Sequence, residues 1–252
     1  MSENTDVKLA TAQETMSVEE YIAKQPTYTT KRIWIRRFIR LVIFKLLCKV
    51  EVTGVENVPD AGSSAIMMNH ISLLDPVLVM GAVTHRFVIP MTKVENLANP
   101  LLRPFVQWWG AFSVNRGEID RKALNNSIEL MKSGQLILVA PEGTRSPEGL
   151  KEPKDGLAFL TTKANAMLIP TAIMGAQDWE KKLKKFKRPH IQVNFGRPFR
   201  FKTEGRTRIP REELTQMTEE AMYQLAMAVT DPTKRGVYAD LSKATTELIE
   251  FV

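Results

Sequence analysis

The sequence is poor in the residues that build disulfide frameworks and metal centres. Its 252 residues include one cysteine, Cys48, and three histidines. A single cysteine excludes a disulfide framework and every metal site that needs several cysteines. The histidines, His70, His85 and His190, show no H-E-x-x-H spacing, so a histidine-rich metal centre is not expected either. The sequence implies no metal and no other cofactor.

Long hydrophobic runs are also missing. A membrane-spanning helix needs about 20 mostly apolar residues, whereas the longest charge-free run before Cys48 in the stretch 31–50 is Leu41–Phe44. The polar residues 1–30 lack the apolar core and small cleavage-site residues of a signal peptide. We therefore expect no simple membrane span over 31–50, and in residues 1–30 a polar lead-in that is either mobile or a short surface helix.

Acidic residues are outnumbered by basic ones, 28 against 35, which gives a formal net charge of +7. This excess favours an anionic partner, and nucleic acid, a phosphate-bearing substrate, an acidic carrier protein and an anionic membrane all fit it. With 44% hydrophobic residues the chain can bury a substantial core, so disorder is excluded for most of its length.

Residues 31–49 are predicted to form a basic amphipathic helix. Arg32, Arg36 and Arg40 recur every four residues among isoleucine, leucine, phenylalanine and tryptophan side chains, and no acidic residue interrupts them. Such a helix lies flat in a bilayer interface, with arginines among the lipid phosphates. The alternative is a helix packed on the protein's own core, with its arginines reaching out to water.

Beyond residue 50, short apolar runs alternate with helical patterns. Strands are predicted at 50–55, 64–68, 85–90, 111–114, 136–139, 168–173 and 191–195, and helices at 76–83, 121–133, 156–164 and 212–229. The fold class is therefore α/β, with a mixed, largely buried β-sheet covered by helices. We expect one domain over 50–205, followed by a C-terminal helix and a tail over 206–252.

The loop after the predicted strand 64–68 contains a histidine and an aspartate. If Asp75 caps a helix that starts at Pro76, its carboxylate can bind one nitrogen of His70 and leave the other facing a cleft. This is the arrangement of a general base held by an acid. The residues alone leave the alternative equally open, in which a loop carbonyl binds a structural His70 and Asp75 is an ordinary N-cap.

Further loops carry cations where a turn alone does not require them. Arg145 lies in Pro141–Ser146, directly after the buried strand 136–139, and Arg116 follows Gly110 at the end of another strand. Lys93 is a further candidate. Arginine suits bidentate recognition of phosphate, although a solvated side chain is the ordinary alternative for each of them.

A more distal segment, Trp179–Arg188, carries six basic residues and one acid. Such a run is usually a solvated face. It could also hold anionic lipid, the phosphates of coenzyme A or an acidic acyl-carrier protein.

Four motifs in a fixed order make the pattern specific. They are N-H-x-x-x-x-D (Asn69, His70, Asp75), G-x-x-x-x-x-R (Gly110, Arg116), P-E-G-T-R-S (Pro141–Ser146) and I-P-T (Ile169–Thr171). This series resembles the glycerolipid acyltransferase family, and within it most resembles the 1-acylglycerol-3-phosphate (lysophosphatidic acid) acyltransferases. The resemblance covers about 50–205. One departure is Ala140, where the family often has an aromatic residue.

The resemblance implies a role for each matching residue. His70 would be the general base and Asp75 would orient it. Arg116 and Arg145, with Lys93, would hold the phosphate of the acceptor. Glu142, Gly143 and Thr144 would shape the acceptor site.

The resemblance also implies the reaction and the partners. A membrane-associated enzyme at the cytoplasmic face would move an acyl group from acyl-CoA or acyl-carrier protein to lysophosphatidate and form phosphatidate, with no nucleic acid involved. Other acceptors remain open: glycerol 3-phosphate, another lysophospholipid or a lyso-aminolipid. The alternative from another class is a non-catalytic basic module that binds membranes or nucleic acid.

Overall fold

The computed structural model describes residues 16–93, 103–114, 121–154 and 156–252. The strands are β1 (Lys49–Thr53), β2 (Ser64–Met68), β3 (Val88–Lys93), β4 (Phe112–Val114), β5 (Leu136–Val139), β6 (Met167–Met174), β7 (His190–Phe195), β8 (Phe199–Phe201) and β9 (Ile249–Phe251). The α-helices are α2 (Val18–Lys24), α3 (Thr29–Phe38), α4 (Asp75–Ala82), α6 (Arg103–Trp109), α7 (Arg121–Lys132), α8 (Leu157–Lys163), α9 (Trp179–Lys184) and α10 (Arg211–Ala228). A 3-10 turn, η1 (Gln25–Tyr28), joins α2 to α3, and α3 continues into a π-helix, η2 (Ile39–Leu47).

Within the described part of the chain, nine strands form one mixed sheet. Their order is β1-β7-β6-β2-β5-β3-β4, with β8 beside β6 and β9 beside β8. Strand β2 is parallel to β5 and β6, and β3 is parallel to β5, whereas β7 runs antiparallel to β6. The predicted α/β class with a mixed sheet is confirmed. Because β2, β3, β5 and β6 share a direction, the loops at their carboxyl ends meet at one edge of the sheet.

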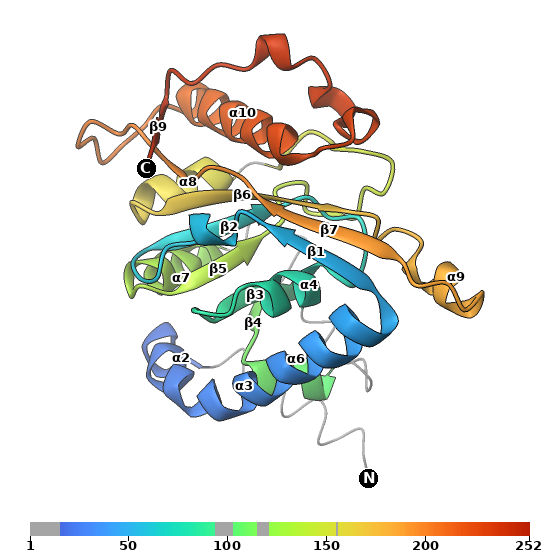
Figure 1. Ribbon diagram of the computed structural model, residues 1–252. Helices are drawn as coiled ribbons and strands as arrows, with labels where there is room; N and C mark the ends of the chain where they lie inside the picture. The colour runs from blue at the N-terminus through green and yellow to red at the C-terminus, as the bar shows by residue number, and fades with distance from the viewer. Residues whose placement is uncertain (1–15, 94–102, 115–120, 155) are drawn as a thin grey trace.

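Helices cover both faces of this sheet (Figure 1). Alternate residues of β2 face opposite sides, as the pleat requires. Ala65 and Met67 belong to one core with residues of α7, α8 and α10, whereas Ile66 and Met68 belong to a second core with residues of α4 and α6. Burial on both faces explains why β2 reads as a continuous apolar run rather than an alternating one.

The predicted helix 31–49 exists as α3 and η2, but its arginine stripe faces the protein. Arg32 is only 2% exposed, and its Nε donates to the carbonyl of Trp109 at 2.6 Å. Arg40 donates to the carbonyl of Gly81 at 3.0 Å, and Arg36 to that of Arg86 at 3.4 Å. The expectation that the arginine stripe lies among lipid phosphates is therefore wrong for Arg32, which is buried and bound to a backbone carbonyl, whereas Arg40 donates to a carbonyl and stays exposed.

Residues 1–15 of the predicted lead-in lie outside the described residues, and residues 16–30 are packed more closely than a mobile segment or a surface helix would be. A capping box between Ser17 and Glu20 starts α2. Tyr21 of this helix is 3% exposed, and its hydroxyl donates to the carbonyl of Gly110. The segment therefore supports residues that lie 89 positions away in the chain.

The C-terminal residues 231–252 are fixed to the domain rather than forming a loose tail. Glu220 of α10 is 1% exposed, and its carboxylate accepts hydrogen bonds from Thr245 and from the backbone of Glu247 and Leu248. Strand β9 then pairs with β8. The sequence analysis missed both of these strands because each has only three residues.

No helix in the described ranges has the length and apolar content that crossing a bilayer would require.

Candidate active site

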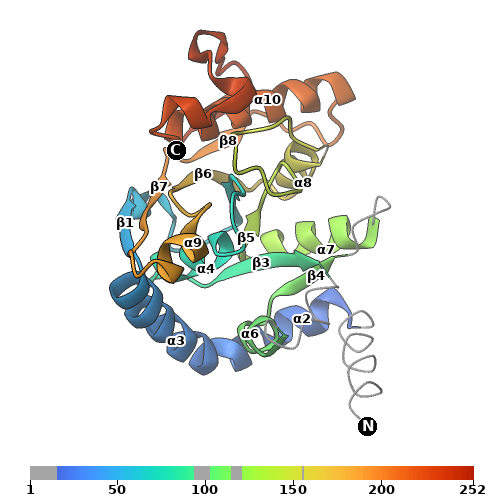
Figure 2. The ribbon, with the colours of Figure 1, turned by 90° about the vertical axis from the view of Figure 1, so that its right-hand side faces the viewer.

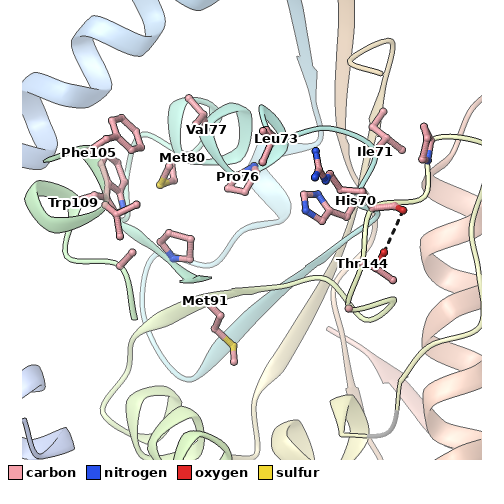
Figure 3. A pocket seen from close by; sticks show the side chains of 16 residues that line it. His70, Ile71, Leu73, Pro76, Val77, Met80, Met91, Phe105, Trp109 and Thr144 are labelled. Carbon is pink, nitrogen blue, oxygen red and sulfur yellow. Dashed lines mark hydrogen bonds between the residues drawn. The ribbon is translucent and has the colours of Figure 1, made fainter. Parts of the chain in front are cut away.

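A half-open cavity of about 620 Å³ lies at the edge where β2, β3 and β5 end (Figure 3). One end is polar and is lined by His70, Thr144 and Arg145. The other end is apolar and is lined by residues that include Val77, Met80, Phe105 and Trp109. The cavity therefore suits a ligand with a polar head and a hydrocarbon chain.

His70 and Asp75 form a direct pair. His70 Nδ1 lies 2.9 Å from Asp75 Oδ2, and the His70 side chain is 19% exposed while that of Asp75 is fully buried. The same carboxylate oxygen accepts from the backbone N–H groups of Ile71 and Ser72, each at 2.7 Å. Because a carboxylate offers acceptors only, Nδ1 carries the hydrogen and Nε2 of His70 is left as an acceptor.

Asp75 reaches this position differently from the way that was predicted. Helix α4 begins at Asp75 itself, and Leu74 stands at the N-cap position. The carboxylate of Asp75 turns back to the preceding loop instead of capping the helix. Burial raises the pKa of Asp75, and the hydrogen bonds from His70, Ser72 and Ile71 oppose that rise.

Asn69 fixes the start of the His70 loop. Its amide binds the backbone of Ile173 in β6 at both ends: Nδ2 donates to the carbonyl at 2.9 Å, and Oδ1 accepts from the N–H at 2.7 Å. Sequence reasoning noted Asn69 as part of a motif but assigned it no role. The position of Asn69 directly before His70 was the feature of the sequence that could have indicated this role.

Glu142 joins the His70 loop to the loop that follows β5. Its Oε1 accepts from the backbone N–H of His70 at 3.3 Å, and its Oε2 accepts from that of Lys151 at 3.1 Å. The residue is 3% exposed, and burial raises the pKa of its carboxyl group despite these hydrogen bonds. A further bond, from the N–H of Ser146 to the carbonyl of His70 at 2.6 Å, connects the same two loops.

The candidate phosphate ligands are only partly brought together. Arg145 and Thr144 are exposed at the polar end of the cavity, beside Gly143. Lys93 ends β3, where its backbone is paired with Val114, two positions before Arg116. Arg116 itself lies outside the described residues, as does the side chain of Lys93.

The apolar wall is supported from the N-terminal segment. Trp109 is 1% exposed, and its indole N–H donates to the carbonyl of Val88 at 2.8 Å. Arg32 binds the carbonyl of Trp109 from the other side, as described above, and Phe105 stacks against the Trp109 ring. Trp109 is buried at the cavity, and the neighbouring Trp108 is 56% exposed.

No group of three histidine, cysteine, aspartate or glutamate side chains in the described ranges is arranged to hold a metal ion. The chemistry available to this site is therefore that of a buried acid, a histidine with a free acceptor nitrogen and a nearby guanidinium group. Such a set can remove a proton from a hydroxyl group and bind an anion beside it.

Comparison with known protein families shows the family to which the chain belongs. The model of the Acyltransferase family matches residues 49–174, half of the chain and all of β1 to β6. The chain belongs to the Acyltransferase family. The match includes His70, Asp75 and the whole loop Pro141–Ser146.

Two bacterial relatives are similar over 58% of this chain. A 1-acyl-sn-glycerol-3-phosphate acyltransferase of Borreliella burgdorferi is 29% identical over 150 residues, which make up 60% of that protein. One of Bacillus subtilis is 27% identical over 146 residues, 73% of its length. The chain thus spans somewhat more than half of the first relative and about three quarters of the second.

The fold also matches a solved structure. The 1-acyl-sn-glycerophosphate acyltransferase PlsC of Thermotoga maritima is similar with a TM-score of 0.57 over 87% of this chain and 94% of that protein. At 21% sequence identity, this similarity shows the shared fold. The acyltransferase family inferred from the four motifs and the predicted fold class are therefore confirmed.

Proposed function

We propose that the protein transfers a fatty acyl group from a thioester donor to the free hydroxyl group of lysophosphatidate, which forms phosphatidate. The observation that carries this proposal is the His70–Asp75 pair at the polar end of a cavity with an apolar far end. The names of the relatives support the choice of lysophosphatidate among acceptors.

The proposed reaction is a direct transfer in a ternary complex. Nε2 of His70 takes the proton of the acceptor hydroxyl group while the oxygen attacks the thioester carbonyl carbon. The C–S bond then breaks, and the leaving sulfur takes the proton back from His70. The negative charge of Asp75 stabilises the imidazolium that exists between these steps.

Arg145 is proposed to bind the phosphate of the acceptor. It is exposed at the polar end of the cavity that His70 lines. A guanidinium group can bind two phosphate oxygens at once. Arg116 and Lys93 are proposed to contribute to the same phosphate site, with Thr144 and Gly143 shaping its rim.

Glu142 is proposed to position the site rather than to touch the acceptor. Its carboxylate is buried and accepts hydrogen bonds from the backbone of both loops. Removing it would leave the bond from the Ser146 N–H to the His70 carbonyl as the remaining described hydrogen bond between the His70 loop and the loop that carries Arg145. The effect on the acceptor would then be indirect.

The protein is proposed to act at a membrane surface, on the cytoplasmic side where the thioester donors are found. The outer side of α3 and η2 exposes large apolar side chains, Trp34 at 64%, Phe38 at 60%, Leu41 at 57% and Leu46 at 61%, beside the exposed basic residues Arg37, Arg40 and Lys45. A bilayer that covers these four apolar side chains would supply a lipid acceptor directly to the enzyme. The apolar residues, not the arginine stripe, make the proposed contact.

A substrate panel tests the proposal. Purified protein would be given acyl-CoA or acyl-carrier protein with lysophosphatidate, glycerol 3-phosphate, lysophosphatidylcholine or a lyso-aminolipid. We expect acyl transfer to lysophosphatidate. Transfer to another acceptor alone would contradict the proposed substrate, and transfer to none would contradict the enzyme.

The variant Arg145→Gln refines that test. It should raise the KM for lysophosphatidate at least about tenfold, because a phosphate contact of a charged group is lost. The KM for the thioester donor should change little. An equal rise for both substrates would contradict the proposed role of Arg145.

A further inference from the structure

The connection between β6 and β7 forms a projection that the proposed reaction does not use. This projection, residues 178–188, consists of the short helix α9 and the turn that leads back to β7. It stands away from the sheet and from the helical layers at the right-hand side of Figure 1, and in Figure 2 it lies in front of the sheet, toward the viewer.

An aromatic side chain lies fully in solvent in this projection. Phe186 is 100% exposed, and its backbone φ is 55°, a left-handed conformation that is uncommon for a residue other than glycine. The N–H of Phe186 donates to the carbonyl of Leu183 at 2.9 Å, and that of Lys187 to the carbonyl of Lys182 at 2.9 Å. These bonds close the turn, so a defined backbone geometry holds the ring away from the protein.

Positive charge surrounds this ring. The projection carries Lys181, Lys182, Lys184, Lys185, Lys187 and Arg188 against Asp178 and Glu180. Lys181 forms an ion pair with Asp178 at 3.0 Å. Lys184, Lys185 and Lys187 are exposed on either side of Phe186. A bare aromatic ring among lysines matches an anionic bilayer, where rings enter the acyl boundary and cations meet phosphates.

The position of the projection supports the same partner. Arg188 Nη2 donates to the carbonyl of Cys48 at 2.7 Å and also to that of Lys45, which fixes the base of the projection to the end of η2. The exposed Leu46 and Leu47 lie at that end. In addition, β6 is parallel to β2. The projection that follows β6 therefore begins at the same edge of the sheet as the loop with His70, which follows β2.

We propose that the projection is a second membrane contact, in which Phe186 inserts into an anionic bilayer and the flanking lysines bind lipid phosphates. The proposal rests on the membrane association proposed above and adds a contact of different chemistry to it. An acidic carrier protein would also meet the lysines, but it would have to offer a pocket for the ring. A bilayer needs none, and the neighbouring leucines of η2 face the same partner.

Vesicle binding of three variants tests this contact. Phe186→Asn removes the ring, and asparagine tolerates a left-handed backbone. Lys184→Gln with Lys185→Gln removes two exposed charges whose side chains form no hydrogen bond or ion pair with the described residues. The matched control, Lys132→Gln with Lys243→Gln, removes two exposed charges from α7 and the C-terminal segment. Binding is measured by flotation with phosphatidylcholine vesicles that contain phosphatidylglycerol or lack it.

We expect Phe186→Asn to weaken binding to the anionic vesicles about tenfold, because the ring no longer leaves water. The variant Lys184→Gln with Lys185→Gln should weaken binding to the anionic vesicles about fivefold or more for each lost charge. Its binding to vesicles that lack phosphatidylglycerol should equal that of the wild type. The control should bind as the wild type does. Wild-type binding by Phe186→Asn, or equal losses in the control and the double variant, would overturn the proposal.

Acyl transfer separates this contact from the function of the site. With a short-chain lysophosphatidate dissolved below its micelle concentration, all variants should transfer as fast as the wild type. Absent transfer in the wild type would contradict the proposed function and leave the vesicle result standing. Normal vesicle binding by the variants, combined with a higher KM for acyl-carrier protein only, would assign the projection to the carrier protein and overturn the membrane contact.

Discussion

Asn69 binds both backbone groups of Ile173 with the two ends of its amide, although the residues are 104 positions apart. Asn69 is 6% exposed, so water cannot replace either of its two hydrogen bonds with Ile173. The bond pair ties the residue before His70 to the central strand β6. The imidazole therefore stands on a loop whose first residue is fixed to the sheet.

Replacing Asn69 should weaken both the fold and the reaction. Asn69→Leu leaves a buried N–H and a buried carbonyl of Ile173 unpaired, which should cost about 2–4 kcal/mol in urea unfolding. The kcat should fall as well, because the His70 loop loses its attachment. The control is Asn57→Ala, which removes a single amide bond to the carbonyl of Phe195. It should cost stability without lowering kcat, and an unchanged kcat in Asn69→Leu would contradict the positioning role.

The variant Asp75→Asn should remove the negative charge of residue 75 and keep the geometry of its hydrogen bonds. Oδ2 makes the three hydrogen bonds, whereas Oδ1 is buried without a hydrogen-bond partner in the described structure. An asparagine can thus place its oxygen at the Oδ2 position and keep the loop and the His70 tautomer. The imidazolium then lacks its counter-charge, and kcat should fall about 10²- to 10³-fold.

The stability of the same variant should not fall at neutral pH. The pKa of Asp75 is raised by burial, so its ionised form opposes folding above that pKa. Asparagine carries no such charge. Thermal unfolding at pH 7.5 should give a melting temperature close to that of the wild type, because removing the buried charge offsets the burial of an amide NH2 without an acceptor at the Oδ1 position. A large loss of stability would show that the carboxylate holds the loop through its charge.

Glu142 should make stability depend on pH with a defined sign. Burial raises the pKa of its carboxyl group above the ordinary value of 4.5. The folded protein therefore binds this proton more tightly than the unfolded chain, and the contribution of Glu142 to stability falls as the pH rises through the folded pKa. Glu142→Gln does not titrate.

Urea unfolding of both proteins between pH 4.5 and 7.5 measures this effect. The free energy of unfolding of Glu142→Gln, minus that of the wild type, should increase with pH over this range. A constant offset is expected in addition, because glutamine offers one acceptor where Glu142 offers two to His70 and Lys151. A difference that decreases with pH would contradict the raised pKa.

Gly110 should tolerate alanine less well than another glycine of similar backbone conformation. Gly110 has φ +70°, and a Cβ there would lie 2.8 Å from the ring of Tyr28. Gly205 has φ +75°, with nothing within 4 Å of such a Cβ. Both Gly→Ala changes should cost about 1–2 kcal/mol for the left-handed backbone.

Only Gly110→Ala should cost about 1–3 kcal/mol more, for the overlap with Tyr28. Because Gly110 follows Trp109 in the cavity wall, its variant should also raise the KM for a long-chain acceptor or donor. Equal losses of stability in the two variants would contradict the tight packing of η1 against Gly110.

Most of the strands, and the possibility that His70 pairs with Asp75, were predictable because their signals are local. A buried strand such as 64–68 shows its apolar run directly, and Asp75 lies only five positions after His70 in the chain. Local chemistry left open whether His70 is a structural or a catalytic histidine. The family motifs favour the catalytic interpretation. The order of the motifs, not any single one of them, carried that information.

Partners distant in sequence could not be predicted in the same way. A stripe of arginines has the same helical spacing whether it faces lipid phosphates or backbone carbonyls, and only the fold brings Gly81 to Arg40 and Trp109 to Arg32. The anchoring of Tyr21 to Gly110 and the buried position of Glu142 have the same origin. Each depends on a contact across dozens of residues that no local pattern encodes.

The proton acceptor is the central element of the proposed mechanism, and His70→Ala tests it most directly. The measurement is the rate of phosphatidate formation from lysophosphatidate and a radiolabelled thioester donor, with folding checked by thermal unfolding. The account predicts a loss of about 10²- to 10⁴-fold in kcat, as for removal of a general base, with binding of lysophosphatidate retained. Transfer by a folded His70→Ala variant at the wild-type rate would contradict the account.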